Sequence, residues 1–167
     1  MYSWDNTVGS SRRVNETVLA YIAGFLDGDG CIKARIEKAP KNKFGWRTSI
    51  RVSFTQHTRN KHVLDWIYNQ LRTGWVADYQ SKRLSEYTIS DSKFIIRLLK
   101  GLRRYVVNKN RQIELALQIL DLKDRYRNEQ SFKRGLELAL KIRSLNNYHK
   151  KHFPSGSPVT TYMEGTG

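Results

Sequence analysis

Residues 20–30 read AYIAGFLDGDG, an apolar helical stretch that ends in two aspartates interleaved with glycines. Asn15 is a favourable helix N-cap, and the apolar residues that follow it recur at helical spacing. We therefore expect a helix from about residue 15 that stops at the glycines of DGDG. The simplest interpretation of Asp27 and Asp29 is that they are turn residues of a glycine-capped helix end. Carboxylates at that end are unfavourable by roughly 0.3–1 kcal/mol, however, because it carries the negative pole of the helix dipole.

The whole chain of 167 residues is strongly basic, with 30 Lys and Arg against 15 Asp and Glu and a formal net charge of +15. Such an excess favours a polyanionic partner, with nucleic acid first and an anionic membrane surface second. No apolar run reaches the ~18 residues of a membrane span, and the first residues lack the pattern of a signal peptide. The single cysteine, Cys31, cannot form an internal disulfide. We expect no membrane association and an intracellular, reducing location, in the cytoplasm, the nucleoid or an organelle.

Downstream of DGDG the periodicity of the apolar residues changes from helical to alternating. Ile32, Ala34 and Ile36 alternate with polar residues, as do the apolar positions of residues 46–54, and a polar turn separates the two stretches. A helical pattern over about residues 58–71 and a second hairpin, WVADYQ and LSEYTIS around QSKR, repeat this order. Three helical patterns follow, over about residues 91–104, 109–126 and 130–146.

This order of elements predicts an α+β fold with an αββαββα core. Helices are expected to cover one face of a four-stranded antiparallel sheet, and further helices follow on the C-terminal side. The other face of the sheet is left to solvent or to a ligand. We expect one domain over residues 15–150, a flexible arm over residues 1–14 and a C-terminal tail over residues 151–167.

The first hairpin and the residues just after it carry more than half of the net charge. Residues 33–61 contain nine Lys or Arg and one acid, Glu37, a net of +8. Basic side chains at alternate strand positions project from one face, and a two-stranded ribbon fits the major groove of B-DNA. A solvated sheet face is the alternative, but the one-sided alternation favours a nucleic-acid surface. The predicted DNA contacts are Lys33, Arg35, Glu37, Lys38, Arg47, Ser49, Arg51, Ser53, Lys61, Tyr79, Lys82, Arg83, Glu86 and Thr88.

A divalent cation between an acid and a phosphate would explain two aspartates beside so basic a surface. A calcium loop of the EF-hand type also begins D-x-D, but its required glycine and bidentate acid would fall on Ile32 and Lys38. Mg²⁺ needs only one or two carboxylates together with phosphate oxygens, so a second copy of the same helix end could supply the rest. The small residues Ala20, Ala23 and Gly24 would let another helix approach closely, although packing inside the core is the alternative.

The stretch YIAGFLDGDG resembles the signature decapeptide of the LAGLIDADG homing endonucleases. A single copy followed by strand, strand, helix, strand, strand and helices, over about residues 15–145, is similar to the single-motif, intron-encoded, homodimeric members. The resemblance implies two motif helices packed across a twofold axis, with the sheets of both subunits lying as saddles in the major groove of the DNA. The dimer contacts that it implies are Tyr21, Ala23, Gly24 and Asp27.

The resemblance also implies roles for individual residues. Asp29 matches the motif's essential metal ligand, and Gly28 matches the position whose backbone carbonyl completes the coordination. Asp27 matches an acid that more often caps and buttresses the helix pair. Gln56 is similar in placement to a glutamine that orders water near the nucleophile, and Lys109 to a basic residue that stabilises charge at the scissile phosphate. The implied cofactor is Mg²⁺, with Mn²⁺ as a substitute and Ca²⁺ binding without turnover.

One position departs from the family pattern. Asn60 stands four residues after the glutamine, where single-motif members often carry a basic residue. The neighbouring Lys61 is the candidate substitute.

Taken with the resemblance, the sequence predicts a site-specific DNA endonuclease that acts on double-stranded DNA as a homodimer. The expected reaction is Mg²⁺-dependent hydrolysis of both strands of a long, nearly palindromic target. An RNA maturase or a nuclease-silent DNA-binding regulator on the same scaffold is the alternative, so RNA is a second, less favoured partner. A basic ribosome-associated protein would explain the charge but not DGDG.

Overall fold

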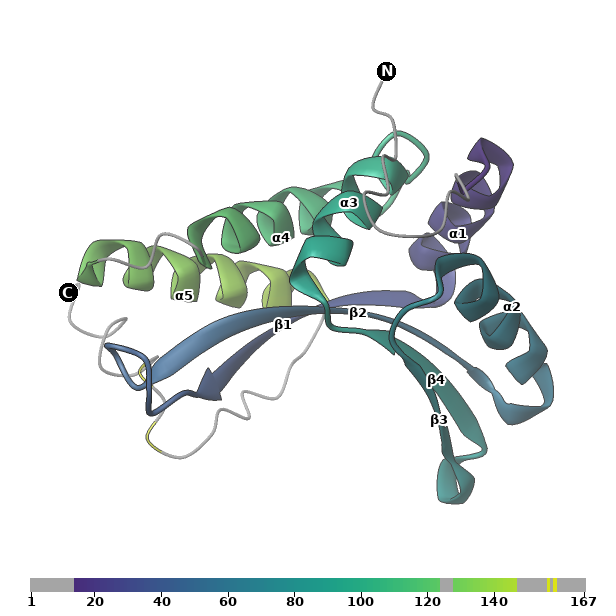
Figure 1. The fold of residues 1–167 in the computed structure, drawn as a ribbon, viewed down its shortest axis with the longest axis horizontal. Helices are drawn as coiled ribbons and strands as arrows, with labels where there is room; N and C mark the ends of the chain where they lie inside the picture. Colours follow the sequence, from purple (N-terminus) through teal and green to yellow (C-terminus); the bar gives the residue numbers. More distant parts are fainter. Residues whose placement is uncertain (1–13, 124–127, 147–155, 157, 159–167) are drawn as a thin grey trace. The chain divides into compact units, whose positions relative to one another are not determined.

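The computed structural model describes residues 14–123, 128–146, 156 and 158 (Figure 1). The elements confirm the predicted order and, with it, the α+β class. In chain order they are α1 (Glu16–Asp29), β1 (Gly30–Lys38), β2 (Trp46–His57), the 3₁₀ helix η1 (Thr58–Asn60), α2 (Lys61–Leu71), β3 (Trp75–Tyr79), η2 (Gln80–Lys82), β4 (Leu84–Ile89), α3 (Ser92–Leu102), α4 (Asn110–Lys123) and α5 (Glu129–Leu145).

Contacts between residues group the chain into two compact units, Met1–Cys31 with Val52–Asn110 and Ile32–Arg51 with Arg111–Gly167. The single domain expected over residues 15–150 stays a prediction. The predicted arm and tail lie outside the described residues, apart from positions 14, 156 and 158. Within the part of the chain that the structure describes, none of the helices has the length and apolar character that a membrane span requires.

The helix α1 begins and ends where the sequence predicts. The side chain of Asn15 accepts a hydrogen bond of 3.0 Å from the N–H of Thr17, as an N-cap does. The helix continues through Asp27 and Gly28 and ends at Asp29, with Gly30 as its C-cap, so the predicted stop at the glycines of DGDG is confirmed. Gly30 is extended, with φ −92°, and a Cβ there would lie 2.6 Å from Cα of Leu26. Only glycine lets the chain turn so closely past the last helical turn into β1.

The four strands form one sheet in the order β1-β2-β4-β3. β4 pairs antiparallel with β2, where Phe54 lies opposite Tyr87, and with β3, where Val76 lies opposite Tyr87. Phe54 and Tyr87 are fully buried, so this face of the central strands is the core face. On β1 and the first half of β2, buried and accessible residues alternate as predicted. Because residues opposite each other share a face, the register sorts every side chain of β2, β3 and β4 onto the core face or the opposite face.

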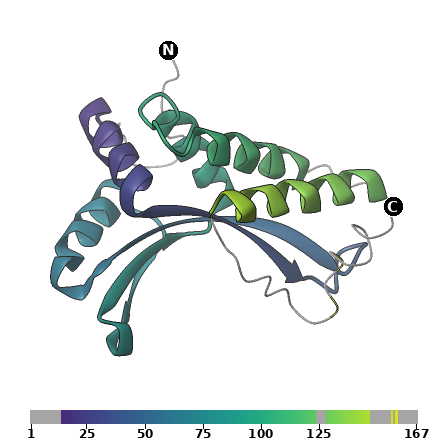
Figure 2. The ribbon, with the colours of Figure 1, turned by 180° about the vertical axis from the view of Figure 1, so that it is seen from behind.

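In the first unit, α1 packs against α3, and α2 packs against β3 and β4. Figures 1 and 2 show α2 beside the β3–β4 hairpin. The connection after α2 is fixed by Gly74, whose φ of 78° suits glycine and where a Cβ would clash with the carbonyl of Thr88. The hydroxyl of the buried Tyr87 donates to the carbonyl of Thr73 at 2.7 Å and fastens the same turn to the core.

In the second unit, α4 and α5 lie side by side and run in opposite directions (Figures 1 and 2). The ring of Phe132 on α5 stacks on the ring of Phe44 in the β1–β2 turn, with centroids 4.8 Å apart. At the other end of α5, the side-chain amide of Asn146 donates to the carbonyl of Ile32 on β1 at 2.8 Å. The first hairpin is thereby held to α5 at two separate points.

Candidate functional site

The end of α1 places Asp29 beside Gln56, near the end of β2. Asp29 is exposed, and its Oδ2 accepts a hydrogen bond of 2.6 Å from Nε2 of Gln56. The other atom of that amide, Oε1, accepts from Nδ2 of Asn60 at 3.4 Å. Asn60 therefore orients the amide so that its NH₂ group faces the carboxylate. Among the described residues, no Lys or Arg forms an ion pair with Asp29.

Asp27 is held in a different way, by the backbone of the loop that leads to α4. Its Oδ2 accepts from the N–H groups of Val107 and Asn108, at 2.6 and 3.1 Å, and its Oδ1 accepts from the N–H of Lys109 at 3.0 Å. Burial raises the pKa of Asp27, but these three hydrogen bonds and the Lys109 ammonium outweigh burial and hold the pKa below its usual value. Asp27 is an ionised anchor for the loop, and its predicted role in buttressing a helix pair stays a prediction.

The loop that Asp27 anchors also fixes the side chain of Lys109. Its Nζ donates to the main-chain carbonyl of Asp27 at 2.8 Å, in the last turn of α1. A cation at this end of a helix is favourable, because the helix dipole leaves partial negative charge there. The structure thus brings the three predicted catalytic side chains, Asp29, Gln56 and Lys109, to the same end of one helix.

The oxygen atoms at this helix end fit a hard divalent cation. The carbonyl of Gly28 lies in the last turn, where helix geometry provides no intrahelical N–H partner, and the carboxylate of Asp29 follows it. Mg²⁺ and Ca²⁺ prefer such carboxylate and carbonyl ligands. Within the described residues, no group of three or more His, Cys, Asp or Glu could hold a metal ion. A cation held by Asp29 and the Gly28 carbonyl must therefore take its remaining ligands from elsewhere, such as water, phosphate or a second chain.

The exposed face of α1 carries a stripe of small and aromatic residues. The residues at this face recur every three or four positions, and they are Thr17, Ala20, Tyr21, Gly24 and Gly28. A Cβ on Gly24 or Gly28 would meet nothing within 4 Å, so the fold of one chain does not require glycine at either position. The ring of Tyr21 meets the ring of Trp66 on α2 edge-on, with centroids 5.1 Å apart, and the two residues are 48% and 40% exposed.

Ala23 does not belong to this stripe. Its side chain is fully buried within its own chain. The prediction that Ala23 is a dimer contact is therefore wrong, because no surface of Ala23 remains for a partner. Among the small residues of the helix, Ala20 and Gly24 occupy the accessible face instead.

Lys61, the candidate substitute for the missing basic residue, is engaged elsewhere. Its Nζ lies 2.7 Å from Oδ2 of Asp78, and Oδ1 of Asp78 accepts from the hydroxyl of Ser85 at 2.7 Å. The hydrogen bond to Asp78 raises the pKa of Lys61, and the same bond lowers the pKa of Asp78. The structure thus places Asn60, and not Lys61, in contact with the predicted site.

Four predicted DNA contacts on the first hairpin converge on Glu37. Its Oε1 lies 3.2 Å from Arg35 and 3.7 Å from Arg51, and its Oε2 lies 3.3 Å from Arg47. The hydroxyl of Ser49 donates to Oε2 at 3.0 Å. Burial raises the pKa of Glu37, but Ser49 and the three guanidinium groups outweigh burial and keep the pKa below its usual value. We call these five residues the Glu37 cluster.

The remaining predicted contacts differ in how accessible they are. Ser53 and Thr88 lie opposite each other on β2 and β4 and are 1% and 7% exposed. They are buried in the sheet of the single chain, so little of their surface is accessible to DNA, and their assignment as DNA contacts stays a prediction. The accessible or half-buried positions are Lys33, Lys38, Tyr79, Lys82, Arg83 and Glu86.

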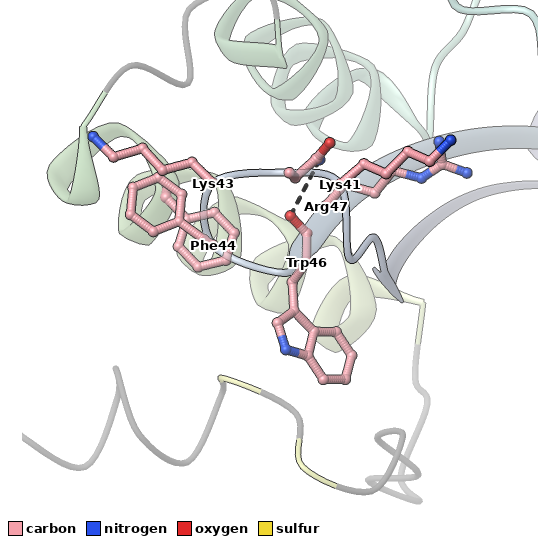
Figure 3. A pocket seen from close by; sticks show the side chains of 7 residues that line it. Lys41, Lys43, Phe44, Trp46 and Arg47 are labelled. Carbon is pink, nitrogen blue, oxygen red and sulfur yellow. Dashed lines mark hydrogen bonds between the residues drawn. The ribbon is translucent and has the colours of Figure 1, made fainter.

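A cationic pocket lies beside the turn of the first hairpin (Figure 3). It has a volume of about 450 Å³ and is lined by the residues Lys41, Asn42, Lys43, Phe44, Trp46, Arg47 and Phe132. The amide of Asn42 donates to the carbonyl of Trp46 at 3.4 Å and closes the turn. The sequence predicts only a basic turn for this stretch. The pocket could not be predicted, because it depends on the stacking of Phe44 on Phe132 of α5, which is far away in the chain.

The sequence of the chain is similar to a known protein family and to two of its members. The sequence profile of the LAGLIDADG endonuclease family matches residues 22–120, which is more than half of the chain. The DNA endonuclease I-CreI of Chlamydomonas reinhardtii is 33% identical over 111 residues, covering 66% of this chain and 67% of that protein. The DNA endonuclease I-CvuI of Chlorella vulgaris is 32% identical over 103 residues, covering 60% and 62% of the two chains. The matches thus span about two thirds of the length of these relatives.

Solved structures share the fold along nearly the whole chain. The homing endonuclease I-CvuI, in complex with its target in the presence of Ca, matches with a TM-score of 0.77 at 24% identity, covering 90% of this chain and 94% of that one. The archaeal intron-encoded homing endonuclease I-Vdi141I, complexed with DNA, matches with a TM-score of 0.72 at 19% identity, covering 90% and 96%. The resemblance of YIAGFLDGDG to the family motif is therefore confirmed, and the chain belongs to the LAGLIDADG endonuclease family.

Proposed function

We propose that two copies of this chain form a site-specific DNA endonuclease that cuts both strands of a long, nearly palindromic target. Mg²⁺ is the proposed cofactor, and the phosphodiester bonds are broken by hydrolysis. The observation that carries the proposal is the convergence of Asp29, Gln56 and Lys109 on the end of the motif helix. The curated relatives are DNA endonucleases, and one solved relative was captured on its DNA target in the presence of Ca.

In the proposed site, the Asp29 carboxylate and the Gly28 carbonyl hold the divalent cation. When bound, such a cation polarises the phosphoryl group and activates water for attack. Asp29 is suited to this role because it is exposed and its hydrogen-bond partner, Gln56, is neutral. A carboxylate already paired with Lys or Arg would bind a cation less well, since the ion pair would have to break first.

Gln56 and Lys109 supply the remaining groups of one half-site. The amide of Gln56 is fixed by Asn60 and can hold a water molecule beside the carboxylate. The ammonium of Lys109 lies at the same helix end and offsets the negative charge that develops on the phosphate during attack. Each side chain has a fixed orientation before substrate binds, which reduces the reorganisation needed in the transition state.

The exposed stripe of α1 supports the two-copy arrangement. Gly24 is a poor residue for a helix interior, costing about 1 kcal/mol relative to Ala, and nothing in its own chain requires it. A second α1 packed against the stripe would explain this glycine, because the missing side chain lets the two helices approach closely. The same packing would bring two Asp29 residues towards each other. A twofold dimer in turn predicts a target with twofold symmetry.

The basic hairpins support duplex DNA as the substrate. Each chain brings a formal charge of +15, so affinity for DNA should fall steeply with salt through counterion release. Accessible basic residues lie on both hairpins, at Arg35, Arg47, Lys82 and Arg83.

The proposal is tested by incubating the purified full chain with Mg²⁺ and with duplex DNA that spans the joined exons of the gene that hosts its coding segment. We expect one double-strand cut near the centre of the joined sequence. Parallel binding measurements in Ca²⁺ separate recognition from cleavage. Binding without any cut would favour the nuclease-silent regulator, and binding to the intron RNA instead of the duplex would favour the maturase.

A further inference from the structure

Glu37 is an acid at the centre of a surface that otherwise attracts phosphate. Its side chain is 17% exposed, whereas the arginines around it, Arg35, Arg47 and Arg51, are 44%, 51% and 33% exposed. A lone carboxylate on a DNA-binding face repels the backbone and lowers affinity. The acid must therefore contribute something other than attraction for DNA.

The contacts of Glu37 direct its carboxylate to its own neighbours in the hairpin. An ionised carboxylate has about four lone-pair sites, two on each oxygen. Oε2 accepts hydrogen bonds from Arg47 and from the hydroxyl of Ser49, and Oε1 forms ion pairs with Arg35 at 3.2 Å and Arg51 at 3.7 Å. Acceptance from a cytosine amino group would compete with these ion pairs. The earlier prediction that Glu37 contacts DNA directly is replaced by a role through its neighbours.

The arginines come from both strands of the hairpin and share this single acid. Each guanidinium presents one edge to Glu37 and keeps further N–H donors that remain accessible to solvent. A free arginine on a sheet samples many rotamers and must be ordered when it binds, which costs about 0.5–1.5 kcal/mol per side chain. Ordering the arginines in advance favours the base sequence that matches their fixed positions.

We propose that Glu37 is a positioning residue for sequence recognition, which holds Arg35, Arg47 and Arg51 in the arrangement that reads the base pairs under the first hairpin. The inference rests on the proposed function, because it presumes that this hairpin meets duplex DNA. Glu37 lowers the affinity of the surface for any DNA and raises the preference for the correct one. Its removal should therefore change affinity and specificity in opposite directions.

The test compares Glu37→Gln with Glu137→Gln in the full chain. Glu137 pairs with Arg134 on α5 at 3.3 Å, so its substitution removes the same charge and also frees an arginine. The wild-type chain first selects its preferred sequences from a randomised duplex library. Dissociation constants for a selected duplex and for a scrambled duplex are then measured in Ca²⁺ for the three proteins.

For Glu37→Gln we expect tighter binding to the scrambled duplex and a ratio of the two dissociation constants that falls by about tenfold. A repeated selection should lose preference only at the base pairs under the first hairpin. Glu137→Gln should leave the ratio and the selected sequence unchanged. Ser49→Ala keeps the charge and removes one hydrogen bond, so it should lower the ratio by a smaller factor. This second variant keeps the test decisive if Glu37→Gln does not fold.

An unchanged ratio in Glu37→Gln and Ser49→Ala would overturn the inference, as would an equal fall in Glu137→Gln. These outcomes differ from a failure of the proposed function. In that case the wild-type chain itself would select no duplex sequence.

Discussion

The end of α1 and the Glu37 cluster both place acids in a strongly basic chain, but they satisfy the charge of those acids in opposite ways. Glu37 meets Arg35, Arg47 and Arg51 within one hairpin, so its charge is balanced by three cations. Asp29 meets only the neutral amide of Gln56 among the described side chains. The first arrangement is complete within one chain. The second leaves negative charge exposed, as a carboxylate that awaits a cation would.

The difference teaches that the surroundings of an acid are more informative than its presence. Asp27 and Asp29 lie two residues apart in one motif, yet three backbone N–H groups bind Asp27 and none is recorded for Asp29 among the described contacts. Asp27 is therefore held by the fold, whereas Asp29 is the acid that we propose for the chemistry. The substitutions below test how Asp29 and Asp27 and the residues around them contribute to cleavage, stability and assembly.

The largest effect is expected from Asp29→Asn, which removes the charge that would hold the cation. Cleavage should fall by at least about 1000-fold, since charge stabilisation by a metal is worth several kcal/mol. Affinity for the duplex in Ca²⁺ should change little, because Asn keeps the shape of the side chain and the basic surface is intact. Single-turnover cleavage and a binding titration on the same duplex measure the two quantities. Undiminished cleavage would remove Asp29 from its assigned role.

Asp27→Asn should instead lower the stability of the fold. At pH 7 we expect the free energy of unfolding to fall by about 1.5 kcal/mol, because hydrogen bonds to an ionised acceptor are lost. The folded-state pKa of Asp27 is lowered, so its contribution is present above the unfolded pKa and is lost as pH falls through the folded value. The difference between variant and wild type should therefore shrink below about pH 4. Urea unfolding at several pH values checks this, and a difference that grows on acidification would contradict it.

Asn60→Ala should slow cleavage roughly tenfold, as the loss of an outer partner of a metal site commonly does. The cause would be a freely rotating Gln56 amide, and the free energy of unfolding should be nearly unchanged. Lys61→Met is the matched control at the adjacent position, because its ammonium is bound to Asp78. Single-turnover rates at saturating protein separate this effect from weaker binding. A larger loss of rate in Lys61→Met than in Asn60→Ala would reverse the assignment.

The smallest of these four effects is expected from Gly24→Ala. A methyl group there has open space, so the monomer should gain up to about 1 kcal/mol of stability from better helix propensity. The dimer should weaken, because the methyl group would hold the two helices apart. Sedimentation analysis and thermal unfolding should thus move in opposite directions. An unchanged dimer would show that the second copy does not pack on this stripe.

Much of the fold followed from local patterns. The cap at Asn15, the change from helical to alternating periodicity after DGDG and the turn residues of both hairpins predicted the elements and their order. The end of α1 at the glycines of DGDG was predicted too, but the close approach of Gly30 to Leu26 depends on three-dimensional packing. Alternation predicts which face of a strand a residue occupies but not how deeply it is buried, and Ser53 is only 1% exposed.

The candidate site was predicted less completely. The motif resemblance pointed to Asp29, Gln56 and Lys109, and the structure brings them to one helix end. The contact of Asn60 with Gln56 could not be foreseen, since it depends on side-chain orientation across the junction of β2 and η1. The ion pairs of Glu37 with arginines from two strands could not be predicted either, because they also depend on side-chain rotamers. Composition marks such a surface as basic without showing which charges are already paired.

The central claim is that Asp29 is the acid that holds a cation and Glu37 is the acid that does not. It is tested most directly by counting the Mn²⁺ ions bound to the complex of the full chain with its selected duplex, using electron paramagnetic resonance. The wild-type chain and Glu37→Gln should bind Mn²⁺ in equal amounts at saturating duplex, and Asp29→Asn should lose the bound ion. Retention of Mn²⁺ by Asp29→Asn, or its loss in Glu37→Gln, would contradict the assignment of Asp29, and not Glu37, as the acid that binds the cation.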